Sequence, residues 1–546
     1  MNVCIARSLA FSVALIVTVG SGSKAATTGS YAVEEKSVAT LQADLTAGRV
    51  TSEQLVQAYL ARIRKIDASG PALHSVIALN AHALADARAS DAERRAGKLR
   101  GPLHGIPVLL KDNIESRDDT ATTAGSQALA ANVTHRDAPL VRRLRDSGAI
   151  ILGKTNLSEW ANIRSTHSVS GWSAVGGLVK NPYALDRTPS GSSAGTGAAI
   201  AASLAAVGVG TETDGSIVSP SSINGLVGLK PTVGLISRTH VVPISQSQDT
   251  PGPMGRSVAD VAALLTAMAG SDPADVATNA ADRHKRDYLA ALAGASLNGK
   301  RLGVLQFATG ALPAVDGLFA QAVALLKAHG AVIVVLKDYK PPATLGDAEL
   351  LVLLTELKVD LNAYLATTPP AVRTRTLAAV IAFNRADPRE LGLFNQDLFE
   401  QAQATKGLSD PRYVKARKTS KRAAGADGID RLIAEHSLDA LIAPSDGPAS
   451  RVDVLTGDHI TGMASSLPAI AGYPHLTVPM GAVDGMPVGI SFIGQAWTED
   501  RLLALGAAYE RAAHRRRAPT YPASVEATSD ITKLLAPQAP FAKKPH

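Results

Sequence analysis

The stretch from Ser190 to Thr232 places the tightest limits on how this chain can fold. It reads SGSSAG, then an alanine-rich run, then VGVGTETDGS, and it ends in GLVGLKPT. Two serine-bearing turns of small residues therefore flank one helix and one strand. Gly215 can adopt backbone angles that other residues avoid, and such a turn can point several N–H groups at one anion. Ser216, which ends that turn, would lie beside its own oxyanion hole, as acyl transfer requires.

The alternation of apolar strand-like and helix-like segments predicts an α/β fold. Residues 301–307, 315–329 and 331–336 read as strand, helix and strand, which favours a parallel or mixed sheet. Two helices then follow each other without a strand between them, which predicts a helical insertion over about residues 340–435. Apolar residues make up 46% of the chain and charged residues 19%, so one large core can form. We expect a single large α/β domain over residues 26–514, with a mixed β-sheet core covered by helices.

Further strands are expected where short apolar runs lie between turn residues. They are residues 76–79, 108–111, 149–152, 207–210, 226–229, 438–443 and 488–492. Residues 156–163 read as the start of a helix, and residues 467–476 as a helix or loop that leads to the last of these strands. Near the start of the chain, Gly48 breaks a helical pattern that restarts at residues 51–53.

The first 25 residues have the pattern of a secretory signal peptide. Arg7 supplies a weak positive region, residues 9–19 form a short apolar run, and residues 23–25 offer a small-residue cleavage site. The apolar run is short for a membrane span, and an uncleaved anchor is the alternative. Cys4 is the only cysteine, so the mature chain would have neither a disulfide nor a cysteine nucleophile. We expect a secreted or periplasmic protein with no membrane attachment after cleavage.

The formal net charge of +7 is concentrated at the two ends of the chain. The signal carries Arg7 and Lys24 and no acid, and residues 515–546 carry six basic and two acidic residues. The body of the protein is therefore close to neutral, and its charge gives no reason to expect nucleic-acid binding. Residues 515–546 are also rich in proline and alanine, and we treat them as a basic tail.

Two short motifs in this region suggest other chemistries. GAIILGKT (residues 148–155) formally matches a phosphate-binding loop, but its apolar middle favours a strand that ends in a turn. GSSAG (residues 191–195) formally matches the nucleophile elbow of α/β hydrolases. That elbow needs a buried strand before it and a histidine late in the chain. A turn precedes it here, and the candidate histidines are His475 and His514.

A third set of motifs resembles the amidase signature family. The matching segments occur in order between about residues 50 and 510, and they are residues 105–113, 153–160, 191–193, 210–216, 225–231 and 471–489. The sequences of these motifs are most similar to those of the peptide amidase branch. The resemblance implies the fold of that family and hydrolysis of a carboxylic amide, with no metal and no other cofactor. It also implies that the substrate is a small amide or an amidated peptide.

The resemblance assigns catalytic roles residue by residue. Ser216 matches the nucleophile, Ser192 the bridging serine that follows a cis peptide bond in the family, and Lys111 the base. The oxyanion donors would be backbone N–H groups of the turn that ends in Ser216. The residues that we expect to bind the oxyanion or the substrate are therefore Thr213, Asp214 and Gly215.

The chemistry of the side chains supports these roles independently. A lysine in water holds its proton at pH 7, but Lys111 follows an apolar strand, and burial lowers a lysine pKa by up to about 3–5 units. Neutral Lys111 could take a proton from Ser192, which would take one from Ser216. Each residue also has an alternative structural role. Lys111 could be a structural lysine paired with Asp112 or another acid. Ser192 and Ser193 could cap the following helix, and Ser216 could be an ordinary turn serine.

The sequence departs from the usual motifs of the family at three positions. Ser190 stands in place of the first glycine of Gly-Gly-Ser-Ser-Gly-Gly, and Ala194 replaces the fifth residue of that motif. Asp214 places an acid beside Ser216. If ionised and facing the site, it would disfavour an anionic substrate end, and alternatively it could bond backbone N–H groups and shape the turn.

Two functions from other classes remain open. One is an amidotransferase subunit of the same family, which would need a cytosolic location, partner subunits and ATP. The signal-like start of the chain opposes it. The other is a non-catalytic secreted binding protein that uses the cleft alone.

Overall fold

An 11-stranded sheet crosses the computed structural model, which describes residues 31–459, 461–462, 464–527 and 529–536. Its strands lie in the order β1 (Val76–Leu79), β3 (Ile150–Thr155), β2 (Pro107–Lys111), β6 (Val207–Glu212), β8 (Thr250–Gly255), β7 (Val227–Lys230), β12 (His475–Val483), β13 (Met486–Ile493), β11 (Ala440–Pro444), β9 (Arg301–Leu305), β10 (Val332–Leu336). Strands β3, β2 and β6 are parallel, as are β11, β9 and β10, and the other neighbours are antiparallel. The predicted single α/β domain with a mixed sheet is confirmed. The expected signal peptide, residues 1–25, lies outside the described residues.

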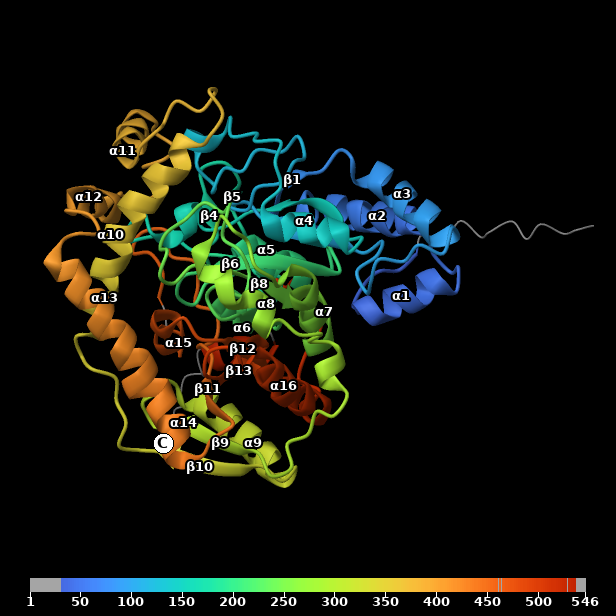
Figure 1. Ribbon diagram of the computed structural model, residues 1–546. Coiled ribbons are helices and arrows are strands. Elements are labelled where there is room, and N and C mark those ends of the chain that lie inside the picture. The colour runs from blue at the N-terminus through green and yellow to red at the C-terminus, as the bar shows by residue number, and fades with distance from the viewer. Residues whose placement is uncertain (1–30, 460, 463, 528, 537–546) are drawn as a thin grey trace, which may run out of the picture.

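The helices surround this sheet. Those of the first half are α1 (Val38–Thr46), α2 (Ser52–Arg62), α3 (Ala83–Arg95), α4 (Pro139–Asp146), α5 (Ala194–Ala201), α6 (Val218–Ile223), α7 (Val258–Met268), α8 (Ala281–His284). Those of the second half are α9 (Pro313–Ala328), α10 (Leu345–Ala366), α11 (Leu377–Ala386), α12 (Asp397–Ala404), α13 (Pro411–Ala424), α14 (Arg431–His436), α15 (Ser466–Ala471), α16 (Glu499–Ala513), α17 (Ser529–Leu535). Helices α1 to α3 lie at one end of the molecule and α10 to α13 along the opposite side (Figure 1). Strands β4 (Trp172–Ser173) and β5 (Gly177–Leu178) pair in a separate small sheet.

The first two helices begin where the sequence supplies capping residues. At the start of α1, the Ser37 side chain accepts a hydrogen bond from the backbone N–H of Thr40. At α2, Thr51 and Gln54 form a reciprocal capping box, which gives partners to N–H groups that a helix start leaves open. Gly48 lies between the two helices with a φ of 66°. The predicted break and restart of this helical pattern are therefore confirmed.

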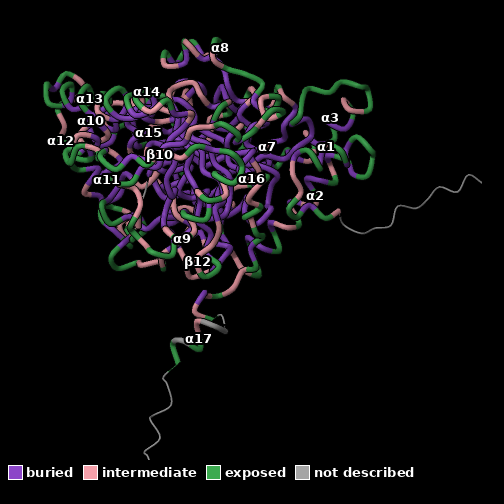
Figure 2. Tube along the Cα trace, turned by 90° about the horizontal axis from the view of Figure 1, so that it is seen from below, coloured by how far each residue is buried: buried purple, intermediate pink, exposed green. Residues whose placement is uncertain are grey.

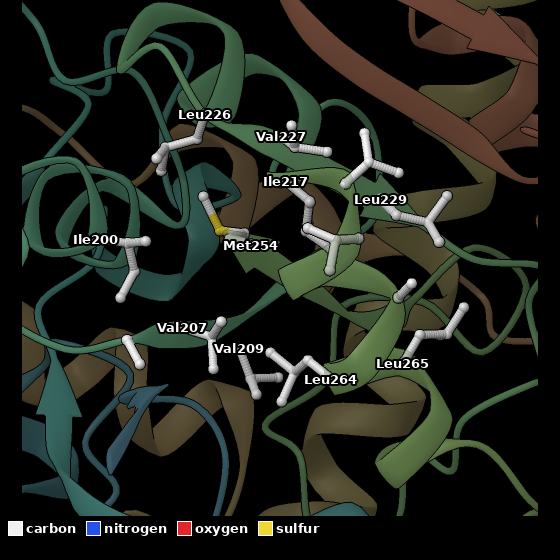
Figure 3. Packing of buried hydrophobic residues seen from close by; sticks show 14 of the residues in the cluster. Ile200, Val207, Val209, Ile217, Leu226, Val227, Leu229, Met254, Leu264 and Leu265 are labelled. Carbon is white, nitrogen blue, oxygen red and sulfur yellow. The ribbon is translucent and has the colours of Figure 1, made fainter. Parts of the chain in front are cut away.

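The core beneath the site is built on both faces of β6. Val207 and Val209 are fully buried, and Figure 3 shows them beside Leu264 of α7. On the other face, a Cβ at position 208 would lie 2.7 Å from Thr196 and 3.1 Å from Ile200 of α5, so Gly208 lets that helix pack directly on the strand. Figure 2 shows that the buried segments lie in the centre of the molecule and the exposed segments around its rim.

Strand β8 is a strand that the sequence pattern does not predict. Its sequence, TPGPMG, contains two prolines and two glycines, and both residue types disfavour strands. In the structure β8 lies between β6 and β7, and it pairs with β6 from Thr250 to Met254. Of the residues of β8, only Met254 and Gly255 pair with β7. Pairing between segments distant in the sequence thus overrides the local preference.

Two further expectations need correction. Residues 156–163 do not start an α-helix, because Glu159–Asn162 form a 3₁₀ turn in which Trp160 and Ala161 have left-handed φ values of 48° and 54°. Residues 467–476 are expected to be one helix or loop, but they contain most of α15 and the beginning of β12. The sequence pattern does not predict β12 because a proline and a glycine interrupt its apolar run.

The segment between β10 and β11, residues 337–439, is fully described and contains helices α10 to α14 and no strand. The first part of the expected basic tail lies against the body. Arg516 pairs with Glu35 at 2.7 Å and donates to the Gly225 carbonyl at 2.7 Å, and the N–H of Tyr521 donates to the Pro182 carbonyl. Within the described ranges, no helix is both long enough and apolar enough to cross a membrane.

Candidate active site

Lys111 is the last residue of β2 and is fully buried. Its Nζ lies 2.7 Å from Ser192 Oγ, 2.9 Å from Thr211 Oγ1 and 3.2 Å from the Thr211 carbonyl oxygen. Burial lowers the pKa of Lys111 to about 7, although the nearby carboxylates of Asp249 and Glu212 act to raise it. The neutral amine is therefore available near pH 7, in contact with a hydroxyl that can donate a proton to it.

Asp112, the alternative partner of Lys111, points elsewhere. Its carboxylate accepts hydrogen bonds from the backbone N–H and the hydroxyl of Thr123, and it lies 3.9 Å from Lys154 Nζ. Successive side chains along an extended segment point to opposite faces, so the side chains of Lys111 and Asp112 point away from each other. The structural pairing of Lys111 with Asp112 is therefore not formed.

Ser192 follows a cis peptide bond from Gly191, as the resemblance implies for the bridging serine. It is fully buried, and the N–H of the next residue, Ser193, donates to the Ser216 carbonyl at 3.2 Å. This bond joins the two serine-bearing turns. Ser193 precedes α5, but its hydroxyl bonds the backbone of Thr211 and makes no capping hydrogen bond. The helix-capping interpretation of this serine pair is therefore wrong.

The turn from Thr213 to Ser216 carries the expected oxyanion donors. Gly215 has a φ of 78°, a conformation that favours glycine. No group in the described part of the chain accepts a hydrogen bond from the four backbone N–H groups of this turn. The N–H groups of the next two residues donate to the Glu212 carboxylate at 2.7 and 3.0 Å. Glu212 thus braces the turn, and the four N–H groups remain available for an anion.

Ser216 lines a cavity of about 240 Å³. The charged and titratable residues around it are Asp214, Asp446, Asp458 and His459, and no described lining residue is a lysine or an arginine. A cavity lined in this way favours neutral or cationic groups over anions. A second cavity of about 450 Å³ adjoins the first and shares with it Ala161, Thr213 and Ile244.

The Asp214 carboxylate faces the start of α15 and, among the described residues, bonds no backbone N–H group. It accepts hydrogen bonds from the hydroxyls of Ser465 and Ser466. Glu349 of α10 lies beside it, and burial together with the charge of Asp214 raises the pKa of Glu349 to about 9. Gln248 donates to Glu349 Oε1 at 2.7 Å and to the carbonyl of the first turn residue at 3.3 Å. The helical segment after β10 therefore supports the outer side of the turn.

The two competing motifs do not form catalytic sites. Residues 150–155 form β3, as the strand interpretation predicts, and Lys154 is buried there with its Nζ bonded to the Ile114 carbonyl and Thr122 Oγ1. His475 is buried on β12 and lies 2.6 Å from Ser491 Oγ through its Nε2. Burial lowers the pKa of His475 to about 3, and among the described residues no hydroxyl of segment 190–195 bonds to it.

Three residues contribute to the site without having been identified from the sequence. Thr211 binds Lys111, Glu212 braces the turn, and Asp249 accepts a hydrogen bond from Thr213 Oγ1 at 2.6 Å. Thr211 and Glu212 belong to the same motif as Ser216, so that motif could have indicated their place in the site. Asp249 lies 36 positions beyond Thr213, and no local pattern marks it. No group of three or more His, Cys, Asp or Glu residues in the described structure could hold a metal ion.

The site lies where the carboxyl ends of two adjacent parallel strands meet. Lys111 ends β2 and Glu212 ends β6, so the turn bearing Ser216 opens at the same edge of the sheet. Ligands bind at this edge in open α/β sheets. A buried lysine that contacts one serine, below a turn that carries a second serine, is an arrangement suited to nucleophilic catalysis by a hydroxyl. The fold and the site together are those of a hydrolytic enzyme built on a mixed α/β sheet.

Comparison with protein-family models identifies the family to which the chain belongs. The family model described as amidase matches residues 54–503. The chain belongs to this family, the amidase signature family, and it is an amide-hydrolysing enzyme.

Similar proteins occur in bacteria and plants. The solved structure of native peptide amidase from Stenotrophomonas maltophilia is 51% identical, with a TM-score of 0.84, and the alignment covers 89% of this chain and 99% of that one. A probable amidase of Arabidopsis thaliana is 40% identical over 94% of this chain and 97% of its own length. A glutamyl-tRNA(Gln) amidotransferase subunit of Halorhodospira halophila is 34% identical over 88% of this chain and 97% of its own length.

Proposed function

We propose that the protein is a serine amidase in which Ser216 is the nucleophile, Ser192 the proton relay and Lys111 the base. The observation that carries this proposal is the 2.7 Å contact between buried Lys111 Nζ and Ser192 Oγ, next to the turn that bears Ser216. A base transfers protons most efficiently when its pKa is close to the working pH. The pKa of about 7 for Lys111 fits that requirement.

The proposed reaction has two half-reactions. Ser216 Oγ attacks the carbonyl carbon of the amide while its proton passes to Ser192 Oγ, whose own proton passes to Lys111 Nζ. The carbonyl oxygen becomes an oxyanion, which would accept hydrogen bonds from the backbone N–H groups of the turn. The C–N bond then breaks as Ser192 gives a proton to the nitrogen, and ammonia or an amine leaves. Water attacks the acyl-enzyme through the same relay, which releases the carboxylic acid and restores Ser216.

We further propose that the substrate is a C-terminally amidated peptide. A peptide amide is neutral at the scissile group, whereas the product is a carboxylate. The cavity around Ser216 is lined by three aspartates and, in its described part, by no lysine or arginine. It would therefore accept the neutral amide and disfavour the anionic product. The similarity to peptide amidase at 51% identity supports the same substrate class.

The two other candidate functions fit these observations less well. An amidotransferase that takes nitrogen from an amino-acid amide would need a cation for the α-carboxylate of that donor. No lysine or arginine lines the described part of the cavity that contains Ser216. Arg238, which lines the adjoining cavity, is already paired with Asp275 at 2.6 Å. A binding protein without catalysis would have no need for a buried lysine in contact with a serine, because burying an amine costs free energy. Because the chain is similar to a glutamyl-tRNA(Gln) amidotransferase subunit, the experiment described below also tests for amidotransferase activity.

Export is also proposed, on the basis of the signal-like pattern of residues 1–25. Mass spectrometry of the protein from the periplasm or the medium should find a chain that begins near residue 26. A full-length chain confined to the cytosol would contradict this proposal.

Ammonia release by the purified protein tests the function. The substrates are a short C-terminally amidated peptide, an amino-acid amide with a free amino group, and an aryl anilide read by its released amine, with the Ser216→Ala protein as control. Ammonia from the peptide amide that is lost in the control would support both the chemistry and the substrate class. Turnover of only the other substrates would keep the chemistry and discard the peptide amide. Activity that appears only with partner proteins and ATP would favour the amidotransferase.

A further inference from the structure

The buried carboxyl group of Asp446 begins a hydrogen-bonded chain that continues through two serines in the wall of the active-site cavity. Asp446 Oδ2 accepts the hydroxyl of Ser219, and Ser219 Oγ lies 2.7 Å from Ser190 Oγ. Asp446 Oδ1 accepts the N–H of Gly447 at 2.8 Å. Asp446, Ser219 and Ser190 all line the cavity that contains Ser216.

Asp446 has few groups to stabilise its charge. The residue is 4% exposed, and no lysine or arginine of the described chain contributes to its pKa. Burial raises the pKa of Asp446 to about 7, while the bonds from Ser219 and Gly447 act to lower it. The carboxyl group therefore ionises near neutral pH, and its charge acts mainly on the Ser219 hydroxyl.

The ionised carboxylate fixes the direction of the hydroxyl protons. Ser219 donates its single proton to Asp446, so towards Ser190 it can only accept. Ser190 therefore donates to Ser219 and keeps acceptor lone pairs on its own oxygen. Hydrogen bonds in a chain polarise one another, so the charge of Asp446 makes Ser190 Oγ a better acceptor. Within the described structure, the Ser190 hydroxyl has no other side-chain hydrogen bond.

Ser190 also lies close to the proposed proton relay along the chain. Only Gly191 separates it from Ser192, which would give a proton to the departing nitrogen. The Ser190 backbone has a φ of 58°, a conformation that favours glycine, and glycine is the residue that the usual family wording has here. The serine hydroxyl is thus an addition to the cavity wall at a position where the backbone does not require it.

We propose that Ser190 is a substrate-binding residue that accepts a hydrogen bond from the departing nitrogen and favours primary carboxamides over N-substituted amides. The inference rests on the proposed role of Ser216. When the C–N bond breaks, its electron pair stays on nitrogen, which takes the proton of Ser192 and leaves as ammonia. A primary amide has a second N–H that can point at Ser190 Oγ. An aryl or alkyl substituent in that place would leave the acceptor without a donor.

Paired substrates test this assignment. The same peptide is offered as its C-terminal amide and as its C-terminal anilide to the wild type, Ser190→Gly, Ser219→Ala and Asp446→Asn. Ser190→Gly suits the backbone conformation and should fold normally. The matched control is Ser221→Ala. Ser221 lies on α6, as Ser219 does, and its buried hydroxyl has no hydrogen-bond partner in the described structure.

We expect Ser190→Gly and Ser219→Ala to lower kcat/KM for the amide about tenfold or more, and for the anilide less than about twofold. Asp446→Asn should shift the amide-to-anilide ratio in the same direction, and Ser221→Ala should leave it unchanged. A ratio that stays at the wild-type value in Ser190→Gly would overturn the proposal, even if Ser216→Ala is inactive as the proposed function requires.

A binding measurement separates failure of this inference from failure of the proposed function. In the Ser216→Ala protein, calorimetry compares the peptide amide with the peptide dimethylamide, which has no N–H on its terminal nitrogen. Adding Ser190→Gly should weaken binding of the amide and leave binding of the dimethylamide unchanged. Equal weakening of both ligands, or of neither, would contradict a hydrogen bond from the terminal nitrogen to Ser190.

Discussion

Replacing Lys111 by methionine should change how the free energy of unfolding responds to pH. Methionine keeps an unbranched side chain but cannot take up a proton. In the folded protein the pKa of Lys111 is about 7, compared with 10.5 for an unperturbed lysine. Between these values the unfolded chain holds the proton and the folded protein does not. Because the unfolded state binds more protons there, wild-type stability rises with pH across this window and is lost as the pH falls towards 7.

The magnitude follows from this linkage. A difference of one bound proton changes the free energy of unfolding by about 1.4 kcal/mol for each pH unit. Between pH 7.5 and pH 9.5 the wild type should therefore gain about 2–3 kcal/mol relative to Lys111→Met. Other titrating groups are common to both proteins and cancel in the difference. The hydrogen bonds lost to Ser192 and Thr211 change the variant's stability by a nearly constant amount and leave the slope unaffected.

Urea unfolding of both proteins at several pH values in this range measures the difference. Parallel stability curves would refute the reasoning that Lys111 is buried in its neutral form. Turnover provides a second measurement, because a general base contributes about 10²–10⁴ in rate. The variant should lose at least about 100-fold in kcat/KM for an amide at pH 7.5, and the wild-type rate should rise as Lys111 loses its proton near pH 7. A variant that keeps its activity would show that Lys111 is not the base.

Three other substitutions test the turn and its support. Ser216→Ala should abolish amide turnover and leave the Tm within about 2 °C of the wild type, because a single small group is removed; surviving turnover would exclude Ser216 as the nucleophile. Gly215→Ala should lower kcat about 10- to 100-fold in steady-state assays, because alanine disfavours the φ of 78° and would displace an oxyanion donor; an unchanged kcat would show that this turn does not bind the oxyanion. Glu349→Gln should stabilise the protein above about pH 5, increasingly so up to about pH 9, because folded Glu349 keeps a proton that the unfolded chain releases near pH 4.5. Thermal melts at pH 5 and pH 8 measure this effect, and an equal shift at both would contradict it.

The proposed catalytic residues could be identified in advance because each ends a short motif that has its own local signature. Lys111 follows an apolar run that becomes β2, and Ser216 follows the run that becomes β6 and a glycine turn. The parallel pairing of β2 with β6 then brings the ends of both segments to one edge of the sheet. The predicted mixed sheet had no assigned strand order, so this pairing comes from the structure and was not itself predicted.

The partners of these residues were harder to predict. Lys111 was expected to pair with its neighbour Asp112 or with Ser192, and the structure brings it to Ser192, which is 81 positions away. Asp214 was expected either to face the site or to bond backbone N–H groups. It lines the cavity, and its carboxylate bonds two serine hydroxyls near α15. Both outcomes depend on which distant segments fold against the turn, and no local pattern contains that information.

The sequence by itself determined the elements of this protein and their chemical content. Apolar periodicity located most of the strands and helices, and the ordered motifs indicated the family and the residues Lys111, Ser192 and Ser216. The tertiary structure alone decided that β8 pairs as a central strand, and that Asp446, 227 positions from Ser219, polarises the wall of the cavity. It also decided the pKa of Lys111. The physical reason is that local preferences depend on neighbours in the chain, whereas desolvation and hydrogen bonding depend on neighbours in space.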